Sequence, residues 1–334
     1  MFAWSSYIYF SKKENMKILV TGACGYQGTI LVPKLLQKKY KVIAVDTQWF
    51  GNHLKKHKNL INLKKNILDI NESDLNGVDI IIHLASIAND PMGDLVHNLT
   101  WEYSCLGTMK LMEFAIKKKV KKIIFASSAS VYGIKKEKRV TENLSLKPVS
   151  IYNKAKMITE RIILSYSDKI NYSIIRPATV CGVSPRMRFD VSVNMMTYQA
   201  LKDSNMTVFG GQQTRPNIHM DDLLDIYIFF LKKEKKYNGI FNAGFENLKI
   251  IDIAKRVKKI IPSNIQIIKN SIDVRDYRID SSKLLSLGFK PKKNIDDAIN
   301  EIFIKYKANI NEVNPKSFSV KWLKKNYKRY FKIN

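Results

Sequence analysis

A tyrosine and a lysine four residues apart, Tyr152 and Lys156, are the side chains of this sequence best suited to proton transfer. Pro148 and Ser150 just upstream are helix-start signals, and on a helix residues at i and i+4 share one face. The lysine ammonium would therefore favour the phenolate and lower a tyrosine pKa that starts at about 10. The pair predicts a base that removes a proton from a hydroxyl group near neutral pH.

A serine-rich stretch, Ser127–Gly133, follows the apolar run 122–126, which is typical of a buried strand. Ligands bind at the carboxyl edge of a parallel sheet, and this is where the hydroxyl groups of the stretch would lie. A serine hydroxyl there is expected to hydrogen-bond the same oxygen that Tyr152 deprotonates.

Three evenly spaced glycines, Gly22, Gly25 and Gly28, stand between a predicted strand at 17–20 and a predicted helix at 29–36. Such a turn brings backbone N–H groups close to a pyrophosphate, and the helix N-terminus adds partial positive charge. Asp46 ends the next apolar run, where a carboxylate accepts hydrogen bonds from ribose hydroxyls and repels the 2′-phosphate of NADP. The loop and Asp46 together predict that the cofactor is NAD.

Apolar runs at 79–85, 122–126 and 172–177 alternate with helical patterns at 107–118 and 153–165. Runs that are apolar throughout indicate strands covered on both faces, so we expect an α/β fold with a doubly wound parallel sheet of the Rossmann type. The pattern loosens beyond Pro177, which predicts a smaller, partly interwoven C-terminal α/β lobe. The expected organisation is an extension at 1–15, an NAD-binding domain at 16–178 with returning segments near 210–245, and a mainly substrate-binding lobe at 179–334.

The net charge of +28 comes mainly from lysines spread over the 334 residues, and no nucleic-acid-binding motif stands out. Such a charge attracts an anionic substrate. The scattered cysteines Cys24, Cys105 and Cys181 have no metal-site spacing and favour a reducing compartment. No apolar run reaches the roughly 18 residues that cross a bilayer. We expect a cytoplasmic protein without a metal site and without a nucleic-acid partner.

Several segments in order make the chain similar to the extended short-chain dehydrogenase/reductases. It resembles in particular their NAD-dependent nucleotide-sugar epimerases and dehydratases, such as the UDP-glucose 4-epimerases. The matching segments are Thr21–Gly28, Asp46, Asp69-Ile70, His83–Ala85, Ser127–Gly133, Tyr152–Lys156, Arg176-Pro177 and Thr214–Asp222. The resemblance covers residues 16 to about 300 and makes Ser128, Tyr152 and Lys156 the expected catalytic triad.

The resemblance also implies two sets of binding residues. Around the cofactor it places Gly22, Gly25, Tyr26, Gln27, Gly28, Asp46, Asp69, Ile70, Leu84, Ala85, Ser86, Ser104, Tyr152 and Lys156. On a nucleotide-diphosphate sugar it places Ser128, Ser130, Thr179, Arg186, Arg188, Asn194, Arg215 and Arg275. Arginine pairs bidentately with phosphate, which is the physical reason for that residue type beside a diphosphate. Family members dimerise, and here the helices at 107–118 and 153–165 would form the homodimer interface.

Two positions decide which reaction the resemblance favours. In 4,6-dehydratases an Asp-Glu pair follows the triad hydroxyl, but here these positions are Ala129 and Ser130. We therefore expect a 4-epimerase that oxidises the sugar C4 hydroxyl through a 4-keto intermediate, in the synthesis of surface-polysaccharide precursors. Ser104 and Cys181 also depart from the family, which usually has asparagine and an aromatic residue there.

Two alternatives stay open beside the 4-epimerase. Segment 184–188 and Arg275 resemble a branch that includes GDP-heptose 4-dehydrogenases, so a nucleotide-sugar 4-dehydrogenase or ketoreductase acting on a GDP-sugar is the first. Epimerases and dehydrogenases share every residue named above. The second is a non-catalytic NAD-binding or RNA-binding protein, suggested by the basic charge and opposed by the intact triad.

Overall fold

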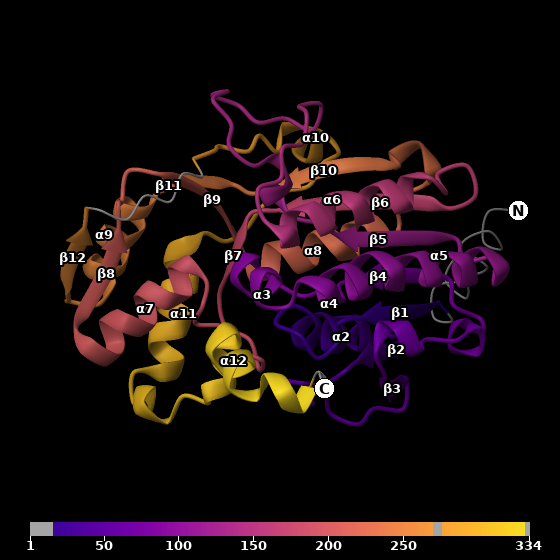
Figure 1. Cartoon of the computed structure of the whole chain (residues 1–334), viewed down its shortest axis with the longest axis horizontal. Helices are drawn as coiled ribbons and strands as arrows, with labels where there is room; N and C mark the ends of the chain where they lie inside the picture. The colour runs from indigo at the N-terminus through magenta and orange to yellow at the C-terminus, as the bar shows by residue number, and fades with distance from the viewer. Residues whose placement is uncertain (1–15, 270–275, 331–334) are drawn as a thin grey trace, which may run out of the picture.

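A parallel sheet forms the centre of the computed structural model, which describes residues 16–269 and 276–330 (Figure 1). Seven strands follow the order β10-β6-β5-β4-β1-β2-β3, and all neighbouring pairs are parallel. Their bounds are β1 Lys17–Thr21, β2 Lys41–Asp46, β3 Leu60–Lys64, β4 Ile80–His83, β5 Lys122–Ala126, β6 Asn171–Pro177 and β10 Gly239–Ala243. The strand order reverses between β1 and β4, and ligands bind at the carboxyl ends of such a switch point.

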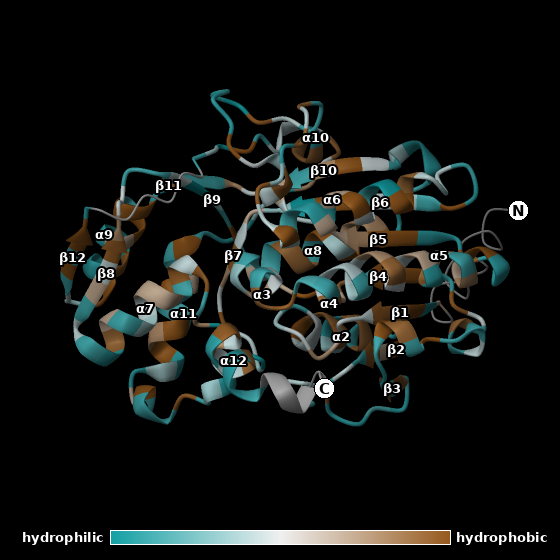
Figure 2. Ribbon diagram, viewed as in Figure 1, coloured by the Kyte–Doolittle hydropathy of each residue, from teal (hydrophilic) through white to brown (hydrophobic). Residues whose placement is uncertain are grey.

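The sheet confirms the doubly wound α/β fold that the apolar runs predict. β3 is the exception, because it is an edge strand on which no residue is fully buried, and Ile61 is 53% exposed. A half-exposed strand lacks the continuous apolar run that marks a central one. Figure 2 shows the hydrophobic colouring of β1, whose residues Ile18, Leu19 and Val20 are fully buried.

Helices cover both faces of this sheet and form two separate hydrophobic clusters. α2 (Gly28–Gln37) and α8 (Met220–Leu231) pack on one face. α5 (Gly107–Lys117) and α6 (Ile151–Leu164) pack on the other. α6 carries both residues of the predicted base pair, so the packing of this helix decides where they lie.

Beyond β6 the chain builds a second lobe, on the left in Figure 1. α7, α9 and α11 pack against β8 around a third hydrophobic cluster, and β8 pairs with β12 in parallel. A three-stranded sheet of order β11-β9-β7 stands between this lobe and the central sheet in the figure. The strands are β7 Thr179–Cys181, β8 Asn205–Phe209, β9 Thr214–His219, β11 Glu246–Lys249 and β12 Asn264–Ile268.

The remaining helices are mostly short. Their bounds are α3 Asp90–Leu95, α4 His97–Trp101, a π-helical turn Glu102–Leu106, α7 Ser192–Asp203, α9 Ile250–Ile260, α10 Ser282–Ser286, α11 Ile295–Tyr306 and α12 Ser319–Tyr330. The 3-10 turns are Ile67–Asp69, Glu72–Leu75, Ala129–Tyr132, Lys235–Tyr237, Ile310–Glu312 and Pro315–Ser317. Among the helices of the two described ranges, none has the length and apolar character to cross a membrane.

The C-terminal helix α12 returns to the first half of the chain. Its Leu323 is fully buried in a small cluster with Ile87, Met92 and Val96, and Trp49 and Phe50 pack against this cluster. α12 therefore lies beside the loop that follows β2. Residues 1–15, which the sequence predicts to be an extension, lie outside the described residues.

Candidate active site

The glycine loop between β1 and α2 has the shape that a dinucleotide needs. Gly22 has φ +70°, and a Cβ there would lie 2.7 Å from the backbone nitrogen of Ala85. A Cβ at Gly28 would overlap the carbonyl oxygen of Gly22. A Cβ at Gly25 would meet only the carbonyl oxygen of Gly22, at 3.1 Å, and the space beyond it is open. Two glycines thus allow the loop to close on itself, and the middle one leaves its backbone accessible to a ligand.

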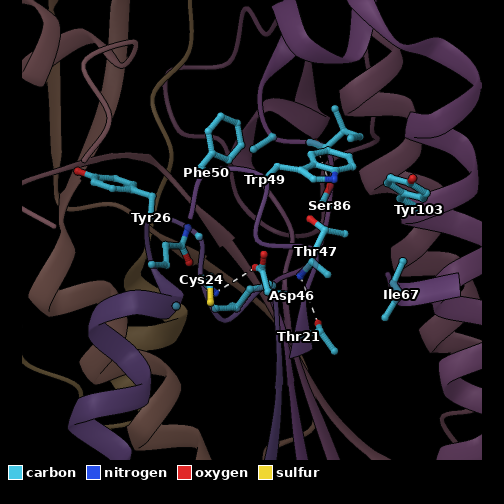
Figure 3. A pocket seen from close by; sticks show the side chains of 18 of the residues that line it. Thr21, Cys24, Tyr26, Asp46, Thr47, Trp49, Phe50, Ile67, Ser86 and Tyr103 are labelled. Atoms are coloured by element: carbon cyan, nitrogen blue, oxygen red, sulfur yellow. Dashed lines mark hydrogen bonds between the residues drawn. The ribbon is translucent and has the colours of Figure 1, made fainter. Parts of the chain in front are cut away.

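A pocket opens directly above this loop, and it contains most of the predicted cofactor residues (Figure 3). In the figure Tyr26 lies at one end, and Ile67 and Tyr103 lie at the other, with Asp46 between them. The predicted residues that line the pocket are Gly22, Gly25, Tyr26, Gln27, Gly28, Asp46, Leu84, Ala85 and Ser86. The glycine-loop backbone and the Asp46 carboxylate along this pocket are the groups that a dinucleotide needs.

Asp46 is oriented by the glycine loop itself. Its carboxylate accepts hydrogen bonds from the backbone N–H groups of Cys24, at 3.0 Å, and Gln48, at 2.6 Å. Burial raises the pKa of Asp46, while the two N–H donors and the charge of Arg186 act against this rise. The fixed carboxylate faces the pocket, where it can accept hydrogen bonds from ribose hydroxyls.

The end of β3 corrects one sequence-based assignment. Asn66 and Ile67 line the pocket, whereas Asp69 and Ile70, predicted to lie beside the adenine, do not. Ile70 is fully buried in the core under the sheet. The physical reason is the length of β3: the strand ends at Lys64, so the chain leaves the sheet edge three residues earlier than the Asp-Ile pair suggests. The position of β3 would have given the correct residues, but this half-exposed strand has no continuous apolar run in the sequence.

Tyr152 and Lys156 lie on one face of α6, with the lysine Nζ 5.9 Å from the centre of the tyrosine ring. Lys156 is 4% exposed, donates a hydrogen bond of 2.7 Å to the carbonyl oxygen of Ala126, and lies 4.9 Å from the ring centre of Phe125. The backbone at the end of β5 thus fixes the lysine head group beneath the tyrosine.

The electrostatics of this pair differ from the sequence-based expectation. Burial raises the pKa of Tyr152 to about 12, with Asp90 adding to the rise and Ser128 and Arg188 opposing it. Burial also lowers the pKa of Lys156 to about 7, against the opposing charge of Glu160. Desolvation therefore outweighs the helix-face attraction on which the expectation of a lowered tyrosine pKa rested. A further positive charge beside the phenol is needed to make Tyr152 a base near neutral pH.

Ser128 lies at the start of the turn that follows β5, within a chain of hydroxyl groups. Its Oγ is 2.6 Å from the Oγ of Ser130, which donates to the side-chain oxygen of Asn153. The hydrogen bond between Ser128 and Tyr152 lowers the tyrosine pKa. Ala129 is 1% exposed and carries no polar group. The structure thus brings the three predicted triad residues together, and neither position after Ser128 supplies a carboxylate.

A buried histidine supports the site from beneath and was not assigned a role from the sequence. His83 Nδ1 lies 2.6 Å from Thr21 Oγ1, and Nε2 lies 2.9 Å from Thr108 Oγ1. Burial, followed by the charge of Lys156, lowers its pKa to about 3, so the ring is neutral. Ser104 is also buried and hydrogen-bonded: it is 2% exposed, and its Oγ lies 3.2 Å from the Oγ of Ser86. Ser104 reaches the pocket wall only through Ser86.

The structure places the predicted substrate residues on several different elements. Asn194 is fully buried, accepts from the Gly182 N–H at 3.1 Å and donates to Tyr26 Oη at 2.9 Å. Thr179 is half-buried in β7, and Arg215, in β9, donates to the Thr214 carbonyl oxygen at 2.9 Å. Arg275 lies outside the described residues.

Arg186 and Arg188 differ from the other predicted substrate residues, because both line the same pocket as the glycine loop. The sequence places them on the nucleotide sugar, whereas their side chains enter the space that fits the dinucleotide.

Comparison with known proteins gives consistent results. A sequence profile described as the NAD dependent epimerase/dehydratase family matches residues 18–244. A UDP-glucose 4-epimerase of Lactobacillus helveticus is 28% identical over 323 residues, which cover 85% of this chain and 95% of the relative. An uncharacterized UDP-glucose epimerase of Bacillus subtilis (strain 168), YtcB, is 32% identical over 263 residues, covering 73% of this chain and 82% of that protein.

A solved structure is similar to this chain over most of its length. The UDP-glucuronic acid 4-epimerase from Bacillus cereus, in complex with UDP-glucuronic acid and NAD, superimposes with a TM-score of 0.76 at 27% identity. The match covers 87% of this chain and 100% of that chain.

Proposed function

The chain belongs to the NAD-dependent epimerase/dehydratase family, and from this premise we propose that it is a nucleotide-sugar 4-epimerase. The observation that carries the proposal is the grouping of Ser128, Tyr152 and Lys156 next to a dinucleotide pocket, without a carboxylate at positions 129 and 130. Loss of water from a 4-keto sugar needs a general acid and base, and a buried alanine and a serine supply neither.

The proposed reaction begins at the C4 hydroxyl of the sugar. Tyr152 removes the hydroxyl proton, and Ser128 hydrogen-bonds the same oxygen. NAD supplies a hydride acceptor and, in its oxidised form, a positive charge that opposes the raised pKa of Tyr152. Lys156, held on the Ala126 carbonyl, keeps the phenol in place and would hold the cofactor ribose. Return of the hydride to C4 on the other face of the 4-keto sugar, with return of the proton from Tyr152 to the C4 oxygen, would complete the epimerisation.

The first test is incubation of the protein with NAD⁺ and UDP-, GDP- or dTDP-sugars. The proposal predicts two C4 stereoisomers from one of them and no net gain in reduced nicotinamide absorbance. A keto sugar formed together with reduced cofactor would instead establish the 4-dehydrogenase alternative, which the segment 184–188 favours. Absence of turnover with every nucleotide sugar would contradict both enzymatic proposals. A cytoplasmic role in surface-polysaccharide precursor synthesis belongs to the same proposal.

A homodimer is part of the proposal as well. Met109 and Ile158 are 47% and 37% exposed and lie on the two helices expected at the interface, and Leu106, 54% exposed, directly precedes α5. Large apolar side chains exposed together are typical of an interaction surface.

We expect the unmodified protein to be a dimer and Met109→Glu to be largely monomeric, because a buried unpaired carboxylate costs several kcal/mol. Sedimentation velocity measures both. Ile304→Glu is the matched control, because Ile304 is 69% exposed on α11 in the second lobe. A monomeric unmodified protein, or an unchanged dimer with Met109→Glu, would refute the proposed interface.

A further inference from the structure

Arg186 and Arg188, in the loop that follows β7, line the cofactor pocket. Both carry hydrogen-bond donors that have no partner among the described residues. Arg186 is 5% exposed and the Arg188 side chain is 12% exposed. Within residues 16–269 and 276–330, the buried Nε of Arg186 and Nη2 of Arg188 have no hydrogen-bond partner. Buried guanidinium donors without partners are costly, so such donors at the wall of a pocket indicate an anionic ligand.

The structure holds Arg186 in one orientation. Its guanidinium carbon lies 3.9 Å from the ring centre of Phe50, and Nη2 donates to Ser319 Oγ at 2.8 Å. Nη1 donates to the Met187 carbonyl oxygen at 3.3 Å. The stacking and the two hydrogen bonds fix the fork, and Nε is the guanidinium nitrogen left without a partner among the described residues. Arg188 is oriented in a similar way by Asp190, whose Oδ1 accepts from Nε at 2.8 Å.

Each of the two arginines lies close enough to a different functional group to act on its pKa. The charge of Arg186 lowers the pKa of Asp46, and the charge of Arg188 lowers the pKa of Tyr152. Tyr26 of the glycine loop lies close enough to both arginines to raise the pKa of each. Asp46 faces the expected ribose of the adenosine half, and Tyr152 belongs to the reacting end. The group that lies between these two ends of a dinucleotide is its pyrophosphate.

We propose that Arg186 and Arg188 bind the pyrophosphate of the NAD cofactor, together with the backbone N–H groups of the glycine loop. Two guanidinium groups match the two negative charges of the pyrophosphate, and charge-assisted hydrogen bonds are the strong ones. Burial and the neighbouring Arg188 lower the pKa of Arg186 to about 9, so an incoming anion relieves an existing electrostatic cost.

The same contacts connect the end of the chain to the cofactor. Ser319 begins α12, lines the pocket and accepts the hydrogen bond of Arg186. Cofactor binding at Arg186 would therefore also hold α12 against the pocket.

The test measures binding without turnover. Because Trp49 lines the pocket, energy transfer from tryptophan to NADH reports occupancy, and NAD⁺, ADP and adenosine can compete with it. Arg186→Gln and Arg188→Gln should each weaken NAD⁺ and ADP by about 10- to 100-fold, the usual effect of losing a charged hydrogen bond. Adenosine, which has no phosphate, should compete within about twofold of its unmodified value. Lys321→Gln removes an exposed charge of α12 outside the pocket and should leave all three affinities unchanged.

Unchanged NAD⁺ and ADP affinities in both variants would overturn the proposal. If KM for the nucleotide sugar rises instead, the arginines bind the substrate, as the sequence resemblance suggests. Arg186→Lys keeps the charge and loses the fork, so it should fall between the unmodified protein and Arg186→Gln, and it serves if the glutamine variant does not fold. The inference rests on NAD as cofactor and not on the fate of the hydride, so failure of epimerisation with intact binding leaves it standing.

Discussion

Replacement of Tyr152 by phenylalanine is expected to lower kcat for the accepted nucleotide sugar by about 10²- to 10⁴-fold, the range that a general base contributes. The substitution removes one hydroxyl from a half-buried side chain and keeps the ring beside Lys156. NADH affinity, measured by the energy transfer described above, should change little. Loss of turnover with retained cofactor binding separates a chemical role from a structural one.

The pH dependence of the same pair sharpens this test. The base must be deprotonated, and burial raises the pKa of Tyr152 to about 12 in the free protein. The rate of the unmodified enzyme should therefore rise with pH along its acid limb, and Tyr152→Phe should abolish that limb. Tyr166→Phe is a suitable control, since Tyr166 lies just beyond the C-terminal end of α6, far along the helix from the triad. Equal turnover by Tyr152→Phe and the unmodified protein would exclude Tyr152 as the base.

The candidate triad and the glycine loop could be predicted from the sequence because each depends on local order. Gly22 needs a positive φ, and Tyr152 and Lys156 need only the helical repeat to share a face. These requirements are visible in a few consecutive residues. The parallel-sheet fold could be predicted for the same reason, because strands buried on both faces are apolar throughout.

Features that depend on distant segments could not be located in this way. Asn66 and Ile67 replace the expected Asp-Ile pair because an edge strand with half-exposed residues left no clear pattern. Arg186 enters the cofactor pocket because Phe50 and Ser319, far from it in the sequence, hold its guanidinium. The raised pKa of Tyr152 results from burial by the assembled fold, which a spacing of four residues does not reveal.

A buried ion pair between Glu160 and Arg176 holds the helix that carries the base. The side chains are 1% and 3% exposed, and the two bonds from Arg176 to the carboxylate are 2.9 and 2.7 Å. Arg176 also donates to Tyr132 Oη at 2.8 Å. Glu160 is four residues beyond Lys156 on α6, so the pair ties the face of α6 that bears Tyr152 and Lys156 to β6.

Glu160→Gln is expected to lower the free energy of unfolding by about 3–5 kcal/mol, because it leaves the guanidinium of Arg176 buried without its counter-charge. Urea denaturation followed by circular dichroism measures the change. The matched control is Glu72→Gln, which removes the partly exposed pair with Lys118 at 3.1 Å. A surface pair contributes at most about 1 kcal/mol, so the control should barely change the denaturation midpoint.

The double variant Glu160→Gln with Arg176→Met tests whether the cost comes from the unpaired charge. Removal of both charges leaves no uncompensated ion, so the double variant should regain most of the stability lost in Glu160→Gln. A regained midpoint with reduced turnover would assign the pair to the orientation of α6, and hence of Tyr152 and Lys156. If the double variant is no more stable than Glu160→Gln, the pair itself stabilises the fold, and the cost of the single substitution is not that of a buried, unpaired Arg176.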